Sequence, residues 1–357
     1  MTESAQPQGG LAGMHPAYFA LVMATGIVSL ACELLGLHPV AVVLFVLNVG
    51  FYPILWALLI ARVIRHRDRV RADLVHHGRA VGFFTIVAAT CVLGSQCLIV
   101  GESLRAALAL WFAGIVLWAV LIYGVFTILT VKTEKPALAE GINGGWLLGV
   151  VAAQSVSVLG AQLAPSLGTH APEALVFSLA MWLGGGMLYL WIISLIFYRY
   201  TFFTMSPSDL APPYWINMGA AAISTLAGTM LVAAAPHSPV LEQILPFVRG
   251  FTWMWWATAT WWIPMLLILG IWRHGVRKFP LRYDPLYWGA VFPLGMYTVC
   301  TFRLSRAVDA EFLIAISRGF MYVALGAWCL AAAGMAWHLG RRRRVPRVGA
   351  TPPAALR

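Results

Sequence analysis

Hydroxyl and amide side chains recur inside long apolar stretches of this 357-residue chain. Such groups can hydrogen-bond an anion weakly, which suits passage because a fixed charge would hold the ion in place. The side chains that we predict to line a pathway for anions are Thr25, Ser29, Thr90, Gln154, Ser157, Asn217, Thr225 and Thr298. The alternative is that these groups join neighbouring helices, as serine and threonine often do in membranes.

The segment YWGAVFPLGMYTVCT (287–301) combines an aromatic residue with a helix breaker. Pro293 has no N–H to bond the carbonyl of Gly289, and a free carbonyl in a membrane is tolerated where it meets water or a polar partner. The pattern therefore predicts a broken helix beside a cavity, with Phe292 and Pro293 forming a hydrophobic gate at the break. The alternative is an ordinary phenylalanine that packs against lipid or another helix.

One arginine lies inside an apolar segment. Arg318 is a turn or two within the last such segment, where a charge at full depth costs about 2.5–3.5 kcal/mol. We expect it to pair with Asp309 or Glu311, or with an acid elsewhere such as Glu33. It could instead extend to the membrane surface. The alternative is that Arg318, Arg249 and Arg303, which fall on the same side, form a vestibule that attracts anions.

Motifs for catalysis and cofactor binding are missing from the sequence. The nine histidines lie in loops or near helix ends, and the five cysteines show no CxxC spacing. We therefore expect no catalytic residue, no metal site and no cofactor, and a protein that is not an enzyme. A membrane-embedded redox or haem protein is the competing class, and the lack of histidine pairs at mid-membrane depth counts against it.

The composition requires a bilayer. Only 10% of the residues are charged, 61% are hydrophobic and the mean hydropathy is +0.80, which a soluble domain could not bury. Ten charge-free stretches are each long enough to cross a membrane. We therefore predict an all-α integral membrane protein with ten transmembrane helices, arranged as five helical hairpins within residues 15–340. Residues 1–14 are expected to form a disordered cytoplasmic lead, and residues 341–357 a basic, disordered cytoplasmic tail.

The net charge is +11, and the basic residues are distributed unevenly between the two sides of the predicted topology. With ten helices, 19 of the 24 lysines and arginines fall on the side of both termini and 5 on the other. An excess of basic residues marks the cytoplasmic side, so we predict a plasma (inner) membrane protein with both termini in the cytoplasm. The basic runs are read as topology signals, with attraction to the anionic headgroups of membrane lipids as the alternative, and no nucleic acid is expected as a partner.

Odd- and even-numbered helices differ in composition. The odd helices are predicted at 17–35, 80–100, 145–163, 213–234 and 286–303, and the even ones at 40–61, 106–130, 174–198, 248–271 and 310–338. Serine, threonine, asparagine and glutamine number 16 in the odd helices and 9 in the even ones, whereas tryptophan numbers 3 and 12. Polar groups avoid lipid and large aromatics suit it, which predicts odd helices inside and even helices outside.

Three motifs carry a resemblance to a known family: HPAYFALVMATGIVSLA (15–31), GGWLLGVVAAQSVSVLGA (144–161) and YWGAVFPLGMYTVCT. They resemble the tellurite-resistance/dicarboxylate transporter family, which includes plant slow anion channels, yeast malate permeases and fungal sulfite exporters. The resemblance implies a quasi-fivefold ring of five hairpins around a central pore, and a homotrimer with one pore in each protomer. It also implies that a phenylalanine at the position of Phe292 occludes the pore.

The predicted function is therefore transport of small anions through a pore that the odd helices line and Phe292 gates. The substrates would be dicarboxylates such as malate or succinate, or inorganic oxyanions such as sulfite, tellurite or nitrate. A proton-coupled dicarboxylate carrier is the alternative. Such a carrier usually needs an ionisable group at mid-depth, and the odd helices have almost none, which favours a channel-like path.

Overall fold

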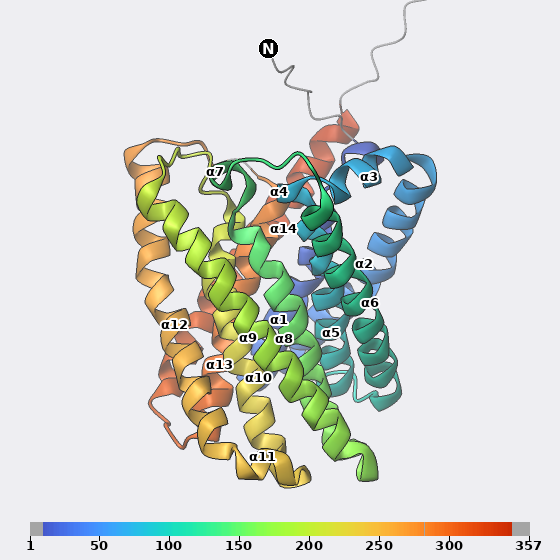
Figure 1. Cartoon of the computed structure of the whole chain (residues 1–357), viewed down its shortest axis with the longest axis vertical. Helices are drawn as coiled ribbons and strands as arrows, with labels where there is room; N and C mark the ends of the chain where they lie inside the picture. Colours follow the sequence, from blue (N-terminus) through green and yellow to red (C-terminus); the bar gives the residue numbers. More distant parts are fainter. Residues whose placement is uncertain (1–9, 282, 345–357) are drawn as a thin grey trace, which may run out of the picture.

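The computed structural model describes residues 10–281 and 283–344. Long helices run side by side through one bundle, and no strand occurs among the described residues (Figure 1). Both ends of the described chain lie at the same end of the bundle. Residues 1–9 of the predicted lead and 345–357 of the predicted tail are outside the described part.

Within the described residues, ten long helices alternate along the chain between two sets. The inner helices are α1 (Ala20–Leu34), α5 (Phe84–Ile99), α8 (Leu148–Leu163), α10 (Ile216–Ala234) and α13 (Trp288–Ala307). The outer helices are α2 (His38–Arg65), α6 (Leu104–Val131), α9 (Ala171–Phe202), α12 (Leu245–Ile271) and α14 (Leu313–Arg344). Four short helices, α3 (Arg67–Leu74), α4 (His77–Ala80), α7 (Leu138–Gly141) and α11 (Pro239–Gln243), lie in the connections.

Each inner helix is entered through a turn of 3₁₀-helix. These turns are η2 (Pro16–Phe19), η3 (Val81–Phe83), η4 (Gly144–Leu147), η7 (Pro212–Trp215) and η10 (Pro285–Tyr287). A proline opens three of the five, at the position where its missing N–H costs no helical hydrogen bond. All five inner helices thus begin at the end of the bundle where the chain termini lie.

The inner helices form a closed ring. Helix α1 contacts α5, α5 contacts α8, α8 contacts α10, α10 contacts α13, and α13 returns to α1. Each outer helix packs on the inner helix of its own hairpin and on the next inner helix, so that α2 contacts α1 and α5, and α14 contacts α13 and α1. The pattern recurs five times and closes on itself, as expected for a quasi-fivefold ring of hairpins.

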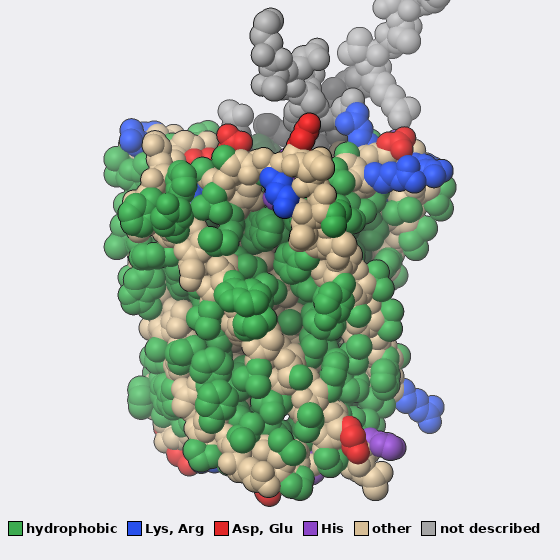
Figure 2. Space-filling model, in the orientation of Figure 1, with side chains coloured by type: hydrophobic (Ala, Val, Ile, Leu, Met, Phe, Trp, Pro, Cys, Tyr) green, Lys and Arg blue, Asp and Glu red, His purple; other side chains and the backbone are tan. Residues whose placement is uncertain are grey.

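Burial separates the two sets of helices. In four of the inner spans, between 83% and 94% of the membrane-length window is buried, whereas in the five outer spans the share is 22% to 44%. The predicted division into odd helices inside and even helices outside is therefore confirmed. Hydrophobic side chains cover the middle of the molecule and charged ones gather at its two ends (Figure 2).

Nine helices in the described ranges are long and apolar enough to cross a membrane. Helix α13 is not among them, because its 20 residues include Arg303, Arg306 and Pro293. It nevertheless lies in the ring between α1 and α10 and pairs with α14, so it completes the predicted set of ten. The less apolar helix is thus the one that carries the predicted gate.

The predicted break at Pro293 does not occur, since α13 runs unbroken from Trp288 to Ala307. The proline lies near the start of the helix, where its missing N–H removes one bond to Gly289 without ending the helix. Its ring packs on α10, where a Cβ built on Gly219 would lie 2.7 Å from the Cγ of Pro293. The proline therefore allows a close approach of two inner helices.

Aromatic donors join the outer ring to the inner ring. Trp111 on α6 donates to the carbonyl of Val156 on α8, and Trp182 on α9 donates to that of Ser224 on α10. The remaining outer helices make comparable bonds, from Trp256 to Thr301, from Trp328 to Thr25, and between Tyr52 and Thr90. Each outer helix thus bonds the next inner helix, so part of the tryptophan excess serves packing instead of the expected contact with lipid.

Candidate anion pathway

Two cavities lie along the ring: the entry turns of all five inner helices line one, and the five inner helices themselves line the other. The first, which we call the N-side cavity, lies where the inner helices begin and has a volume of about 570 Å³. Residues from every entry turn line it, namely Ala17, Gly82, Gly145, Pro213 and Leu286. It therefore forms one mouth of the ring.

The glycines at this mouth allow the entry turns to approach one another. A Cβ built on Gly144 would lie 2.5 Å from the carbonyl oxygen of Pro213, and one on Gly82 would lie 3.0 Å from the backbone nitrogen of Ala17. Larger side chains would push η4 away from η7 and η3 away from η2. Local sequence thus brings the five helix starts together.

Five helix N-termini around one cavity favour a negative ligand, because each carries a partial positive charge. Side chains cap several of the first N–H groups. His15 Nδ1 accepts from the N–H of Ala17 at 3.1 Å, and Asn143 Oδ1 accepts from that of Gly145 at 2.8 Å. The macrodipoles themselves remain aligned toward the cavity.

His15 is held neutral beside this mouth. Burial, followed by the charge of Arg79, lowers the pKa of His15 to about 4. Because Nδ1 accepts a hydrogen bond, the ring proton resides on Nε2. Arg79 and the buried Arg62 both pair with Asp73, the latter at 2.7 Å, and this cluster fixes the chain just before η2.

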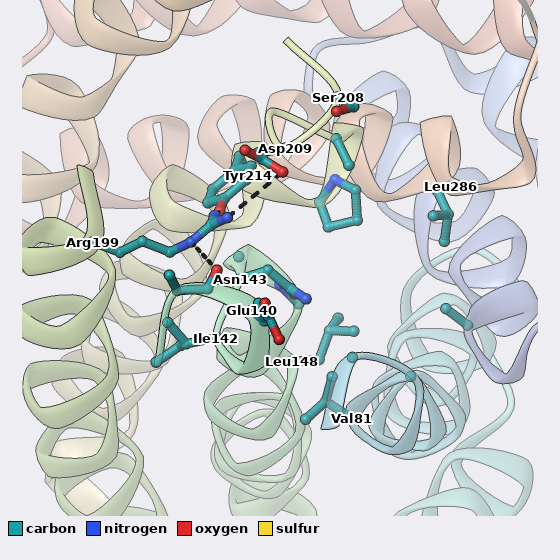
Figure 3. A pocket seen from close by; sticks show the side chains of 18 of the residues that line it. Val81, Glu140, Ile142, Asn143, Leu148, Arg199, Ser208, Asp209, Tyr214 and Leu286 are labelled. Carbon is teal, nitrogen blue, oxygen red and sulfur yellow. Dashed lines mark hydrogen bonds and ion pairs between the residues drawn. The ribbon is translucent and has the colours of Figure 1, made fainter. Parts of the chain in front are cut away.

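Three charged side chains line the N-side cavity: Arg199, Asp209 and Glu140 (Figure 3). Arg199 reaches in from the end of α9, where its Nε donates to the carbonyl of Ala139 at 2.6 Å and its Nη1 donates to the hydroxyl of Tyr214. Sequence reasoning missed this arginine because it follows a long charge-free stretch, where it was read as a topology signal. Its place between two aromatic residues was the one available hint.

The second cavity, which we call the C-side cavity, lies toward the other end of the ring. Its volume is about 20 Å³, enough for roughly one water molecule. The wall is mainly apolar, with polar groups from Ser95, Ser155 and Gln162, of which Ser95 donates to Gln162 Oε1 at 2.7 Å. This side of the path is nearly closed.

Arg303 on α13 is the one charged residue among the described residues that line the C-side cavity. The structure gives it no hydrogen bond or ion pair within the described part. A guanidinium beside a cavity on the ring axis can bind an anion. By contrast, Arg249 and Arg318 are exposed and line neither cavity. The described ion pairs also leave out Arg318, so its expected pairing with Asp309 or Glu311 is not seen.

A solid layer separates the two cavities. On α8, Leu148 lines the N-side cavity and Ser155 lines the C-side cavity, seven residues and about 10 Å further along the helix. Phe292 lies within the corresponding interval of α13, between Leu286 and Met296. It is 1% exposed and lines neither cavity.

Helical spacing puts Phe292 on the ring-facing side of α13. Met296, Val299 and Arg303 line the C-side cavity. Phe292 precedes them by four, seven and eleven residues, which is the spacing of one helix face. Its side chain therefore lies on the same face of α13 as the residues that line the C-side cavity.

The eight polar side chains predicted to line the path are absent from the walls of both cavities. Most of them bond outer helices instead. Ser29 donates to the carbonyl of Ala41 on α2, and Gln154 donates to that of Trp182 on α9. Thr25, Thr90, Ser157, Asn217 and Thr298 also bond, through side chain or carbonyl, to residues of outer helices.

Thr225 donates to the carbonyl of Ala221 within its own helix. The hydroxyl of Thr298 likewise bonds its own helix, at the carbonyl of Leu294. All eight residues are buried, and the hydrogen bonds satisfy most of their polar groups. Gln154 Oε1 and Asn217 Oδ1 have no partner among the described residues. The alternative interpretation, polar side chains that join helices, therefore describes six of the eight.

Comparison with known proteins fits this geometry. The chain matches the family model described as SLAC1, voltage-dependent anion channel, over residues 13–336. The chain belongs to the SLAC1 family. The matched range contains all three motifs, so the resemblance drawn from them is confirmed.

Relatives of this SLAC1-family protein come from distant organisms. An uncharacterized transporter of Methanocaldococcus jannaschii is 27% identical over 327 residues, which covers 88% of this chain and 90% of the relative. The sulfite efflux pump SSU1 of Trichophyton rubrum is 25% identical over 358 residues, with 90% of each chain covered. An uncharacterized membrane protein of Mycobacterium tuberculosis is 39% identical over 152 residues, which covers 43% of this chain and 77% of the relative.

Membership of the SLAC1 family, together with the long apolar helices, identifies a multi-pass membrane protein that transports small anions.

Proposed function

We propose that the protein conducts small inorganic oxyanions, with sulfite as the leading substrate, along the axis of the inner ring. The observation that carries this proposal is the alignment of the two cavities. Residues of all five entry turns line the N-side cavity, residues of all five inner helices line the C-side cavity, and one layer with Phe292 lies between them. The name of the fungal relative supports sulfite.

The path is open at one end and nearly closed at the other. Five helix N-termini attract an anion into the N-side cavity. Arg303 offers a positive charge after the seal. Passage requires the Phe292 ring to leave the layer between them, which is a hydrophobic form of gating. Pro293 would set the position of that ring by fixing α13 against Gly219 on α10.

A channel-like mechanism is favoured over a proton-coupled carrier. Glu140 and Asp209 line the N-side cavity, whereas the wall of the C-side cavity has no carboxylate among its described residues. A proton relay would need such groups at mid-depth. Dicarboxylates, tellurite and nitrate are the competing substrates for the same path.

We further propose a homotrimer in the plasma membrane, with both termini in the cytoplasm and membrane lipids around the outer ring. The charge asymmetry supports the orientation, because 19 of 24 basic residues fall on the side of the termini. The trimer rests on the family resemblance.

A flux panel in proteoliposomes tests the proposed function. Purified protein would be reconstituted and uptake of sulfite, nitrate, chloride, tellurite, malate and succinate compared with protein-free liposomes. We expect sulfite flux to exceed dicarboxylate flux and to require no pH gradient. Dicarboxylate flux that depends on an imposed proton gradient would support the carrier instead.

A further inference from the structure

Arg199 is a fixed, buried cation on the wall of the N-side cavity. Its side chain is 9% exposed, and the bonds to Ala139 and Tyr214 hold its Nε and Nη1 in place. A guanidinium has five N–H groups, and these two bonds use two of them. The remaining donors, on Nη1 and Nη2, have no hydrogen-bond partner in the described part of the chain.

Nη2 of Arg199 lies near a carboxylate but makes no hydrogen bond with it. Asp209 Oδ1 lies 3.8 Å from Nη2, beyond hydrogen-bonding distance (Figure 3). The other oxygen, Oδ2, accepts from the N–H of Ser206 at 2.8 Å, so the carboxylate is tied to its own loop. The side chain of Asp209 is 33% exposed, more than that of Arg199.

We propose that Arg199 is an oxyanion-binding subsite at the entrance of the path and that Asp209 is a built-in competitor for it. An incoming oxyanion would take the free N–H groups of Nη2 and displace Asp209 toward the solvent. Tyr214 also lines the cavity. Because its oxygen accepts from Arg199, its own O–H is free to donate to the same anion. The inference rests on the proposed function.

The planar fork of a guanidinium explains why the ligand would be an oxyanion. Two parallel N–H donors match two oxygens of sulfite or of a carboxylate, whereas chloride offers a single centre. The nearby carboxylate of Asp209 has two oxygens, as the oxyanion does, so the two can compete for the same N–H groups of Arg199. A loose contact of this kind leaves the site available to a ligand that bonds at normal distance.

Glu140 gives an internal control for charge. It lines the same cavity and is exposed, but no hydrogen bond or ion pair to Arg199 is among its described contacts. Neutralising either acid makes the cavity more positive by the same amount. Only neutralising Asp209 would free the guanidinium.

The test is saturable uptake of radiolabelled sulfite into inverted membrane vesicles from cells that express the full chain, since these vesicles expose the N-side cavity. We expect Asp209→Asn to lower the half-saturating sulfite concentration by about threefold or more, and Glu140→Gln to lower it by clearly less. Arg199→Gln should raise it by about tenfold, and Arg199→Lys by less. In the Arg199→Gln background, Asp209→Asn should have no further effect.

The outcomes separate this inference from the proposed function. Absence of sulfite uptake by the unsubstituted chain would count against the proposed function. Saturable uptake with equal effects of Asp209→Asn and Glu140→Gln, or with the same Asp209→Asn effect in the Arg199→Gln background, would overturn the subsite alone. If Arg199→Gln does not fold, two comparisons still test the subsite. One sets Asp209→Asn against Glu140→Gln, and the other repeats Asp209→Asn in the Arg199→Lys background.

Discussion

Pro293 on α13 and Gly219 on α10 pack so closely that a Cβ at position 219 would lie 2.7 Å from the proline ring. Phe292 directly precedes Pro293, so this contact fixes where Phe292 lies along the axis of the bundle and how its segment of α13 is tilted. A contact this close between α10 and α13 leaves little room for the proposed gate, Phe292, to move independently of its helix.

We therefore predict that Gly219→Ala changes resting sulfite flux and destabilises the protein by about 1–3 kcal/mol, because an added methyl in a tight contact forces the helices apart. The control is Gly184→Ala on α9, where an added Cβ meets nothing within 4 Å. Thermal unfolding and flux would be measured on the same preparations. Equal behaviour of the two variants would show that the contact has no role.

The hydrogen bond from Trp328 to Thr25, at 3.0 Å, should act on stability and leave flux unchanged. Trp328→Phe and Thr25→Val should each lower stability by about 0.5–1.5 kcal/mol, and the double variant should cost less than the sum. The exposed Trp191 supplies the control, as Trp191→Phe. A change in anion selectivity with Thr25→Val, without loss of stability, would instead support the prediction that Thr25 lines the path.

Arg303→Gln should reduce sulfite flux by about tenfold, because it removes the one charge on the described wall of the C-side cavity. Arg318→Gln, a matched change at an exposed arginine of α14, should leave flux near that of the unsubstituted chain. Initial rates in proteoliposomes at equal protein content provide the measurement. Similar losses in both variants would point to the general surface charge and not to the cavity.

His15 gives a pH dependence whose sign follows from its pKa. Burial lowers that pKa from 6.5 to about 4 in the folded protein, so between these values the unfolded chain binds more protons. The stability from neutral His15 is thus present above pH 6.5 and is lost as the pH falls toward 4. His15→Asn, which can still cap η2, should lose less stability between pH 7 and 4.5 than the parent chain.

The exposed His170 provides the comparison, as His170→Asn. Thermal unfolding at several pH values would follow both variants. If His15→Asn and the parent chain lose the same stability on acidification, His15 does not carry this dependence.

The sequence was sufficient to predict the ring but not the direction of its side chains. Charge-free runs and the contrast between odd and even helices predicted which helices are buried, because lipid contact selects composition along a whole helix. The inner helices are buried on nearly every face, so composition does not separate the face toward the axis from the face toward the outer helices. Thr25 and Ile27 are two residues apart, yet Thr25 bonds α14 and Ile27 lines the C-side cavity.

Arg199 was missed for a related reason. A basic residue at the end of an apolar run is the usual mark of the cytoplasmic boundary. Only the fold shows that the last turn of α9 reaches the mouth of the ring, beside Tyr214 and Asp209 from the following segment. The gate at Phe292 stays a prediction, because the helix break that marked this position does not occur.

The most direct test compares sulfite flux through Phe292→Ala with flux through Phe19→Ala. Both rings are 1% exposed, but Phe19 packs edge-on against Tyr52 and Trp56 of α2. Phe19→Ala should cost about 3–5 kcal/mol, as for a packed core ring, and should not raise flux per folded molecule. Phe292→Ala should cost less, because cavities lie on both sides of its layer, and should raise flux, with Phe292→Leu intermediate. Lower flux and a stability loss as large as that of Phe19→Ala would contradict the gate.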